Sequence, residues 1–543
     1  MSKYSDLFKK GEYEELWDSC CGFIDLSLES FMKIQHRLLL EQLELLKKCE
    51  LGNIVFKGSN PRTVEEFREM VPLTNYDDYA PYLLKRRMDI LPRKPILWQY
   101  TSGKAGEYSF RWAPITARQL DEIEPMVFAL LFLSSCNGRR EITLKEHDKF
   151  LYGMAPPPYA TGTMARVLPH EIFDFLPRVG EAERMPFEDR VKKGFDMALS
   201  DGLDIFCAMS SVAVAIGERL SQKSGKTNYK ALLKKPRALL RLAKGLIKSK
   251  LAGRPLMPKD LWDLKGLSTF GIDSSIYRER IKEMWGRYPL DFHGCTEAPL
   301  IAMQTWDYQG MTFIPHLNFF EFIPEDEAVK SWQDPSYQAK TYLMDEIKPG
   351  NYELVITNFQ GGPFVRYRLG HLVKITSLRN DKLNIDIPQM LFLSRIDDQI
   401  DIAGFTRLSE KVIWQAIENS KTIDSGWVVR KETEQDKPII HLYIETRNSH
   451  NGTAEEIAAA VHQELKKLDK PYSELEDFTG IRPIKVSLLP KNAFKLYKLK
   501  QQASGAEISH LKPPHLNPTQ DMVDFLANAD IKAVTEIKEK VEA

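Results

Sequence analysis

The chain has 543 residues, several times the ~100–150 residues of one domain, so two or more compact units are expected. Its 43% hydrophobic, 28% charged and 10% aromatic residues are typical of a folded globular protein and exclude global disorder, collagen and coiled coil. The 75 Lys and Arg balance the 75 Asp and Glu, so no net field steers the whole molecule to nucleic acid or an anionic membrane, and such a partner would need a local patch.

Cysteine usage and the apolar runs indicate a cytoplasmic protein. The six cysteines include no CxxC pair and lack histidines at metal-ligand spacing, and a secreted disulfide framework would be denser. The first residues lack the apolar core and the cleavage site of a signal peptide. The longest apolar runs, 126–133 and 205–216, fall short of the ~20 residues that cross a bilayer, so no transmembrane segment is predicted.

Helical and extended patterns alternate along the first part of the chain. Residues 16–50 have apolar positions at helical spacing, as in LLLEQLELL, which predicts one or two amphipathic helices. An extended ILWQY precedes the loop TSGKAG and a second extended run, YSFRWAPIT, and a helical pattern resumes at 116. A strand-like KFLYGM and a proline-rich loop follow. This alternation predicts α/β layers over an all-α or all-β fold.

Segment 219–259 contains thirteen Lys or Arg and no Asp or Glu. Its leucines fit a helical stripe, which predicts a basic amphipathic helix. Two interpretations are open. A solvated helix packed by its leucine face is favoured because charge runs usually face water, and the other is a surface for an acidic partner or a membrane.

The pattern of predicted strands and helices changes near residue 398. Short extended runs such as YELVITNF precede this point, and two strand-like runs, a helix, a further strand and a charged helical tail follow it. We therefore place a domain boundary here. The N-terminal domain is predicted to span 1–396, with a helical region 1–90 and a core 91–396, and the C-terminal domain to span 397–543.

The loop TSGKAG is the first candidate site. Its small residues would let backbone N–H groups approach a phosphate, and Lys104 would add a positive charge. A plain Gly/Ser turn between strands is the commoner explanation of such a loop, and the P-loop spacing is absent.

Three later motifs carry polar residues beside extended runs. In HGCTE, Thr296 and Glu297 offer the oxygen ligands that Mg²⁺ takes, and a strand-ending turn with a surface Glu is the alternative. In VRYRLGH, alternation puts Arg366 and Arg368 on one face, where burial calls for a phosphate, a carboxylate or a paired acid. In RIDDQIDIAG, the charged joint is either a hinge between domains or a surface turn.

The order and spacing of the four motifs resemble those of the adenylate-forming superfamily of acyl- and aryl-CoA ligases, adenylation domains and luciferases. The resemblance is closest to the Gretchen Hagen (auxin-responsive) acyl acid–amido synthetases and runs from about 65 to 515. TSGKAG resembles the family's phosphate loop, HGCTE its Tyr-Gly-x-Ser/Thr-Glu motif, VRYRLGH its Tyr-Arg-x-Gly-Asp motif and SRIDDQI its hinge. It implies an α/β fold, with a large N-terminal adenylate-forming domain whose sheets are flanked by helices and a smaller mobile α+β C-terminal domain.

The activity that the resemblance implies is that of a ligase. Such an enzyme uses ATP and Mg²⁺ to activate a carboxylic acid as an acyl-adenylate and passes the acyl group to an amine, here expected to be an amino acid. An acyl- or aryl-CoA ligase is the first alternative. A catalytically degenerate adenylate-fold protein that serves as a binding or scaffold module is the second, because a fold does not guarantee its usual chemistry.

The resemblance also assigns residues. The implied ATP contacts are Thr101, Ser102, Gly103, Lys104, Gly106, Gly271, His293, Gly294, His371 and Arg395. The implied catalytic residues are Thr296 for phosphate, Glu297 for Mg²⁺ and Lys512, which would swing in for adenylation. Asp397 would be the hinge. The implied acyl pocket contains Phe206, Met209 and Val212, for which plain core is the alternative.

Three of these residues depart from the family pattern. His371 stands where the family has an Asp that binds the ribose, His293 where it has a Tyr that stacks on adenine, and Lys104 where it usually has Thr or Ser. A neutral imidazole offers one acceptor in place of a bidentate carboxylate, so weakened nucleotide binding is expected.

Overall fold

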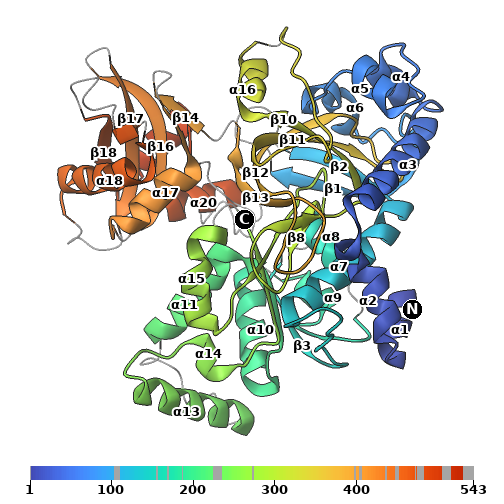
Figure 1. Cartoon of the computed structure of the whole chain (residues 1–543). Helices are drawn as coiled ribbons and strands as arrows, with labels where there is room; N and C mark the ends of the chain where they lie inside the picture. The colour runs from blue at the N-terminus through green and yellow to red at the C-terminus, as the bar shows by residue number, and fades with distance from the viewer. Residues whose placement is uncertain are drawn as a thin grey trace. The chain divides into compact units, whose positions relative to one another are not determined.

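The computed structural model describes residues 2–102, 110–154, 157–167, 170–185, 187–223, 235–271, 274–334, 336–396, 399–402, 406–422, 424–434, 437–446, 452–470, 472–473, 482–503 and 515–529. The chain divides into two compact units (Figure 1). The first contains Met1–Thr101 and Arg111–Phe392, and the second includes Leu393–Ala543. Within the described ranges, each helix is too short or too polar to span a bilayer.

The N-terminal region is helical, as its apolar periodicity predicts. Its helices are α1 (Lys3–Lys10), α2 (Tyr13–Cys21), α3 (Leu28–Leu46), α4 (Glu50–Phe56), α5 (Val64–Met70) and α6 (Ala80–Leu83), with 3-10 turns at Gly22–Asp25 and Tyr76–Asp78. The Ser27 side chain caps the first turn of α3. Buried Gln35 on α3 donates to the carbonyl oxygens of Pro315 and Asn318 at 2.7 and 2.8 Å and accepts from the Phe320 N–H at 3.0 Å. These bonds fix α3 against the central sheet.

An eleven-stranded sheet, counted over the described residues, lies at the centre of the first unit. Its order is β10-β11-β12-β13-β9-β8-β7-β6-β5-β3-β4. The strands are β3 (Lys149–Tyr152), β4 (Asp174–Leu176), β5 (Ile205–Met209), β6 (Gly266–Phe270), β7 (Leu290–His293), β8 (Ala302–Gln304), β9 (Met311–Phe313), β10 (Asn318–Pro324), β11 (Gly350–Asn358), β12 (Tyr367–Ser377) and β13 (Gln389–Arg395). Strands β4, β3, β5, β6 and β7 run parallel, whereas β8 is antiparallel to both β7 and β9, and β11 to both β10 and β12.

Helices cover both faces of the parallel strands. The helices after residue 116 are α7 (Ala117–Ser135), α8 (Ala160–Val167), α9 (Val179–Ala182), α10 (Phe187–Asp201), α11 (Ser210–Lys223), α13 (Pro236–Leu251), α14 (Pro258–Leu261), α15 (Ser274–Trp285) and α16 (Glu325–Gln333). On β5, Phe206 packs in the hydrophobic cluster that α10, α11 and α15 share, while Cys207 faces α7 and α8. Successive strand residues point to opposite faces, so these helices form two layers.

The strand-like runs around TSGKAG form a hairpin, β1 (Pro95–Ser102) with β2 (Phe110–Thr116). Thr101 and Ser102 are the last residues of β1. The predicted phosphate-loop residues Gly103, Lys104 and Gly106 lie outside the described residues.

The second unit has the α+β character that the sequence predicts. Its elements are β14 (Gln399–Ile402), β15 (Thr406–Ser409), α17 (Glu410–Asn419), β16 (Asp424–Glu434), β17 (Lys437–Thr446), α18 (Ala454–Leu468), β18 (Ile484–Leu488), α20 (Ala493–Ala503) and α21 (Gln520–Ala527). Strand β17 pairs antiparallel with β16 and parallel with β18. Trp427 and Val429 pack on one face of this sheet, in a cluster with α17 and α18, and Val428 packs on the other with α20 and α21. Helices therefore cover both faces here too.

Candidate functional site

The carboxyl ends of β5, β6 and β7 lie at one edge of the sheet, because these strands are parallel. Open α/β sheets bind ligands outside this edge. Ser210 follows β5, Gly271 follows β6, and the HGCTE motif begins at the last residue of β7. The Ser274 hydroxyl at the start of α15 donates to the Gly271 carbonyl at 2.9 Å and accepts from the Ser210 hydroxyl at 3.1 Å. Gly271 and the HGCTE motif, predicted from separate parts of the sequence, thus lie at the same edge.

Two of the predicted site glycines, Gly271 and Gly294, have a backbone reason to be glycine. Gly271 has φ of +131°, a conformation that residues with a side chain rarely adopt. At Gly294, a Cβ would lie 2.1 Å from the Pro299 carbonyl oxygen. The Cys295 N–H donates to the Ala298 carbonyl at 2.8 Å and closes the turn. The absence of a side chain therefore lets the HGCTE segment fold back tightly after β7.

His293 and His371, two of the residues that depart from the family pattern, are in contact. Nε2 of His293 at the end of β7 lies 3.1 Å from Nδ1 of His371 on β12. Both are buried, and the His293 ring stacks on Phe392 of β13 with centroids 4.8 Å apart and planes at 23°. At this distance one imidazole donates and the other accepts, so protonating both rings would leave two donors and two like charges facing each other. The sequence contained no signal for this contact.

Glu297 is half-buried and next to a buried phenol. The hydroxyl of Tyr367 lies 3.5 Å from its Oε1, and the Asn358 amide donates to its main-chain oxygen at 3.0 Å. Burial, with the nearby Glu297 carboxylate as the next cause, raises the pKa of Tyr367 well above its usual value, so the phenol stays a neutral donor. Thr296 is buried beside it. The turn thus places a hydroxyl and a carboxylate next to each other in the chain.

These oxygens suit Mg²⁺ only with help from a substrate. Within the described ranges there is no group of three or more His, Cys, Asp or Glu that would hold a metal by itself. Mg²⁺ is usually bound through one or two carboxylates, substrate phosphates and water. A single carboxylate at Glu297 fits that mode of binding.

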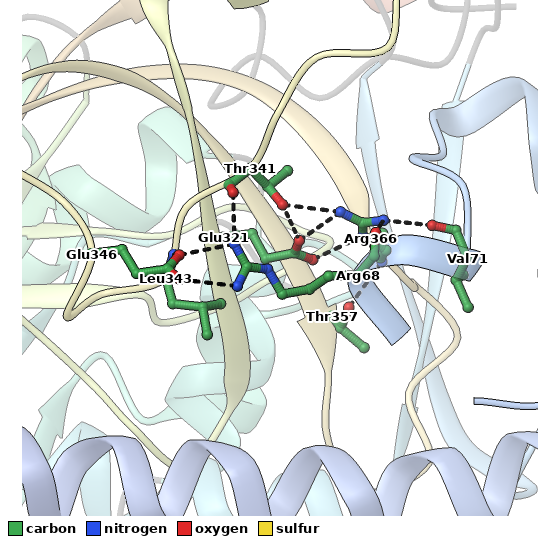
Figure 2. A network of polar contacts seen from close by, with 8 residues as sticks. All are labelled: Arg68, Val71, Glu321, Thr341, Leu343, Glu346, Thr357 and Arg366. Atoms are coloured by element: carbon green, nitrogen blue, oxygen red, sulfur yellow. Dashed lines mark hydrogen bonds and ion pairs between the residues drawn. The ribbon is translucent and has the colours of Figure 1, made fainter. Parts of the chain in front are cut away.

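Arg366 has a paired acid, which is one of the three partners that the sequence left open. Figure 2 shows its guanidinium against Glu321 of β10, with Nη2 2.7 Å and Nε 3.1 Å from the carboxylate oxygens. The Thr341 hydroxyl donates to the same carboxylate at 2.7 Å, and Nη1 donates to the carbonyls of Arg68 and Val71. Arg366 and Glu321 expose only 6% and 1% of their side chains, so the pair is part of the protein interior.

Arg368 is held in the same way by a second acid. Its Nε lies 3.1 Å from Oε2 of Glu353 on β11, and Nη1 donates to the Ser331 hydroxyl at 3.0 Å. The guanidinium lies over the Trp332 ring, 4.5 Å from its centroid, and the indole N–H donates to the same carboxylate at 3.2 Å. Both arginines are therefore satisfied by groups of the protein itself and are scaffold residues.

The predicted acyl-pocket residues separate into two groups. Phe206 is fully buried and lies against Trp285 with ring centroids 4.8 Å apart, and Val212 packs at the margin of the same cluster. Both side chains pack in this cluster, as the alternative of plain core expects, and their place in an acyl pocket stays a prediction. Met209, two residues after Cys207, belongs to the other face of β5 and is half-buried.

A small apolar cavity lies on that other face, between the sheet and helices α7 and α8. Its volume is about 20 Å³, and its lining residues are Val127, Leu130, Leu131, Phe150, Met154, Thr161, Met164, Cys207, Ser268 and Phe292. Sequence analysis did not identify this lining. The alternation along β5 separates its two faces, but only the strand order brings β3 and β6 beside β5, and β7 beside β6.

Of the remaining predicted residues, the structure describes only Arg395. Arg395 is the last residue of β13. The hinge residue Asp397 and the catalytic candidate Lys512 lie outside the described residues.

Comparison with protein-family models gives three matches in chain order. The model of the GH3 family N-terminal domain matches residues 21–153, that of the central domain 311–395, and that of the C-terminal domain 415–521. A curated relative, the 4-substituted benzoates-glutamate ligase GH3.12 of Arabidopsis thaliana, is 29% identical over 113 residues, which are 21% of this chain and 17% of that protein. The chain thus aligns with less than a fifth of that relative's length.

Solved structures show the same architecture. AtGH3.15 acyl acid amido synthetase in complex with 2,4-DB superposes with a TM-score of 0.67 over 93% of this chain and 95% of that one, at 16% identity. A 2-hydroxyisobutyryl-CoA ligase in the postadenylation state superposes with a TM-score of 0.56 over 94% and 91%, at 14% identity. The α/β fold with a large N-terminal and a smaller C-terminal domain is therefore that of adenylate-forming enzymes.

Proposed function

The chain belongs to the GH3 family, and from that membership we propose that it is an acyl-adenylate-forming ligase. In the proposed reaction a substrate carboxylate oxygen bonds to the α-phosphorus of ATP, and the bond to the leaving pyrophosphate breaks. The nitrogen of an amine, in our proposal an amino acid, then bonds to the acyl carbon, loses a proton and releases AMP. The observation that carries this proposal is the HGCTE turn, which places Thr296 and Glu297 at the carboxyl edge of the parallel strands.

The first step joins an anion to a polyanion, so its barrier is electrostatic. Preorganised donors and cations lower such a barrier, and deleting one typically costs about 10²–10³ in rate. Glu297 would hold Mg²⁺, which when bound supplies positive charge to the phosphates. Thr296 would donate its hydroxyl to a phosphate oxygen, and the tight turn at Gly294 fixes both side chains relative to β7. Phe206, Met209 and Val212 are the acyl-pocket candidates of this proposal.

The nucleotide site of this proposal contains Thr101, Ser102, Gly103, Lys104, Gly106, Gly271, His293, Gly294, His371 and Arg395. We propose that the domain boundary falls at 396/397, and that the C-terminal domain turns about Asp397 to bring Lys512 to the phosphates. Rigid-body closure of this kind needs only a few hinge residues to absorb the change in dihedral angles. The reaction is proposed to take place in the cytoplasm.

Two other functions are supported by specific observations. The fold shared with a 2-hydroxyisobutyryl-CoA ligase keeps CoA as a candidate acceptor in place of the amine. The His293–His371 contact favours a binding protein that no longer adenylates, because two residues of the nucleotide site bond to each other. The acceptor and the first half-reaction must therefore be tested separately.

An ATP–pyrophosphate exchange assay over a panel of carboxylic acids tests the first half-reaction. We expect exchange that depends on one class of acid and on Mg²⁺, and the absence of acid-dependent exchange would contradict the proposal. Product analysis with amino acids or CoA as acceptor then separates the two ligases. Lys512→Ala should slow exchange, and Lys491→Ala, at an exposed position of the same unit, is the matched control.

A further inference from the structure

Helix α13 carries an apolar stripe on its solvent side. Leu240, Ile247 and Leu251 expose 57%, 60% and 85% of their surface, more than any other large hydrophobic residue in the described part of the chain. Their spacing of seven and four residues puts them on one face of the helix. Figure 1 shows α13 at the lower margin of the first unit, apart from the central strands. The stripe is thus a feature of the protein surface.

The other face of α13 fixes this orientation. Ala238, Leu242, Gly245 and Ser249 are buried, and α13 packs against α10 and α14. A Cβ at Gly245 would lie 2.6 Å from Cδ2 of Leu261, so the two helices touch closely. The favoured expectation of a helix packed by its leucine face is confirmed for Leu242 and Leu246, which pack in a hydrophobic cluster, and is wrong for Leu240, Ile247 and Leu251. Small residues form most of the packed face, because they allow the close approach.

Positive charge surrounds the stripe. Lys244 lies between Leu240 and Ile247 in the same row, one turn from each, and Lys248 and Lys250 are exposed nearby. Segment 219–259 carries thirteen Lys or Arg and no acid, within a chain of zero net charge.

Two other charged residues near α13, Arg241 and Asp260, are bonded to groups of the protein itself. Arg241 donates to the carbonyl oxygens of Ala198 and Leu199 at the end of α10, at 2.9 and 2.5 Å. Asp260 on α14 is bound by Arg254 through two bonds of 2.7 and 2.8 Å. The exposed lysines therefore give α13 a local field that is complementary to an anionic surface.

We propose that α13 docks the protein on an anionic lipid bilayer. Leu240, Ile247 and Leu251 enter the boundary between headgroups and acyl chains, and the lysines around them contact lipid phosphates. An aliphatic stripe flanked by lysines is the pattern of helices that lie in the membrane interface. A soluble acidic chain without apolar groups would be held by the charges alone, whereas a bilayer also takes up the three aliphatic side chains. The docking is separate from the proposed catalytic site and holds whatever acid the enzyme uses.

Vesicle flotation with the full chain tests the proposal. Vesicles of phosphatidylcholine alone are compared with vesicles that also contain phosphatidylserine, at about 0.1 M salt, where the screening length is about 10 Å. We expect binding to the phosphatidylserine vesicles only, and its decrease as the salt concentration rises. No binding to phosphatidylserine vesicles overturns the proposal.

Two variants of α13 and one control assign the surface. Leu240→Ser/Ile247→Ser/Leu251→Ser and Lys244→Gln/Lys248→Gln/Lys250→Gln should each lower the vesicle partition coefficient at least tenfold. The control Met70→Ser/Leu378→Ser/Leu488→Ser removes three other exposed hydrophobic residues and should bind as the wild type does. The melting temperature of all three variants should match that of the wild type, because every changed residue is exposed.

Two results would overturn the assignment even if vesicles bind. Unchanged binding of the serine variant would show that the aliphatic stripe does not enter the bilayer. A wild-type protein that binds soluble polyglutamate as tightly as vesicles, with equal affinity in the serine variant, would show a surface that recognises charge and an acidic protein as its partner.

Discussion

The region around β12 carries two kinds of buried ionisable group within six residues. Arg366 meets the Glu321 carboxylate of β10 and Arg368 the Glu353 carboxylate of β11, and both are bonded to further groups, so they are fixed parts of the scaffold. His371 meets His293, an imidazole that can give or take a proton. All were motif residues in the sequence. A buried charge with a bonded counter-charge thus holds the fold together, whereas the two histidines meet ring to ring without opposite charges.

Removing the counter-charge of Arg366 should cause the greatest loss of stability. Glu321→Gln leaves the Arg366 guanidinium buried without its counter-charge and should lower the free energy of unfolding by about 3–5 kcal/mol. Urea unfolding of the whole chain measures it. Glu41→Gln, which breaks the exposed pair with Arg37, is the control and should cost only about 0–1 kcal/mol.

A loss below ~1 kcal/mol in Glu321→Gln would contradict the scaffold role. The double variant Arg366→Met/Glu321→Leu removes both charges and should recover part of the stability, because well-packed apolar residues can replace a buried ion pair.

A change at the proposed Mg²⁺ ligand should alter activity and not stability. Glu297→Ala removes the carboxylate proposed to hold Mg²⁺ and should lower acid-dependent pyrophosphate exchange by about 10²–10³. The melting temperature should stay close to that of the wild type, because Glu297 is only half-buried. Glu69→Ala, at an exposed position, is the control. Exchange at the wild-type rate would remove the metal role of Glu297.

A change in the histidine pair should have a smaller effect on function, and it should strengthen ATP binding. His371→Asp restores the carboxylate that the family uses for the ribose hydroxyls. Exchanging one neutral hydrogen bond for charge-assisted bonds should tighten ATP binding by roughly 1–2 kcal/mol, or about tenfold to thirtyfold. Calorimetry on both proteins measures the two dissociation constants, and His371→Asn controls for side-chain shape without the charge.

Two other results of this calorimetric experiment would each change the interpretation. Weaker ATP binding by His371→Asp would show that the histidine makes its own nucleotide contact. Failure of both proteins to bind ATP would overturn the adenylation proposal and leave the binding protein.

A partly exposed ionic cluster around Glu432 in the second unit should have a weaker influence, which is confined to the pH dependence of stability. Burial alone would raise the pKa of Glu432, but hydrogen bonds from Tyr443, His441 and Arg430 outweigh it and lower the pKa to about 2. A carboxyl whose folded pKa is depressed stabilises the fold above its unfolded pKa of 4.5 and loses that contribution as the pH falls toward 2.

The melting temperature of the wild type should therefore fall more steeply between pH 5 and pH 2 than that of Glu432→Gln, with the two curves converging at the acid end. Glu434→Gln, at a more exposed position of the same strand, should keep the wild-type slope. Parallel curves for the wild type and Glu432→Gln would show that this carboxyl does not contribute to the pH dependence.

The sequence by itself determined the features that local patterns encode. Apolar periodicity predicted the N-terminal helices, α13 and the α/β alternation, because side-chain direction repeats within a few residues in helices and strands. The motif glycines are also local, since Gly271 needs an unusual φ and Gly294 a close turn. The assignment of residues in HGCTE and VRYRLGH to a nucleotide site came from resemblance and not from these patterns.

Only the tertiary structure decided which groups meet. Arg366 is paired with an acid 45 positions away, and His371 with a histidine 78 positions away. Neither pair joins adjacent strands of the sheet, so both contacts depend on how the whole sheet and its connections fold, which local spacing does not encode. The outward direction of the Leu240 stripe was likewise set by α10 and α14, against which the small residues of α13 pack. A local pattern fixes which residues share a face, and only the packing of distant segments decides what that face contacts.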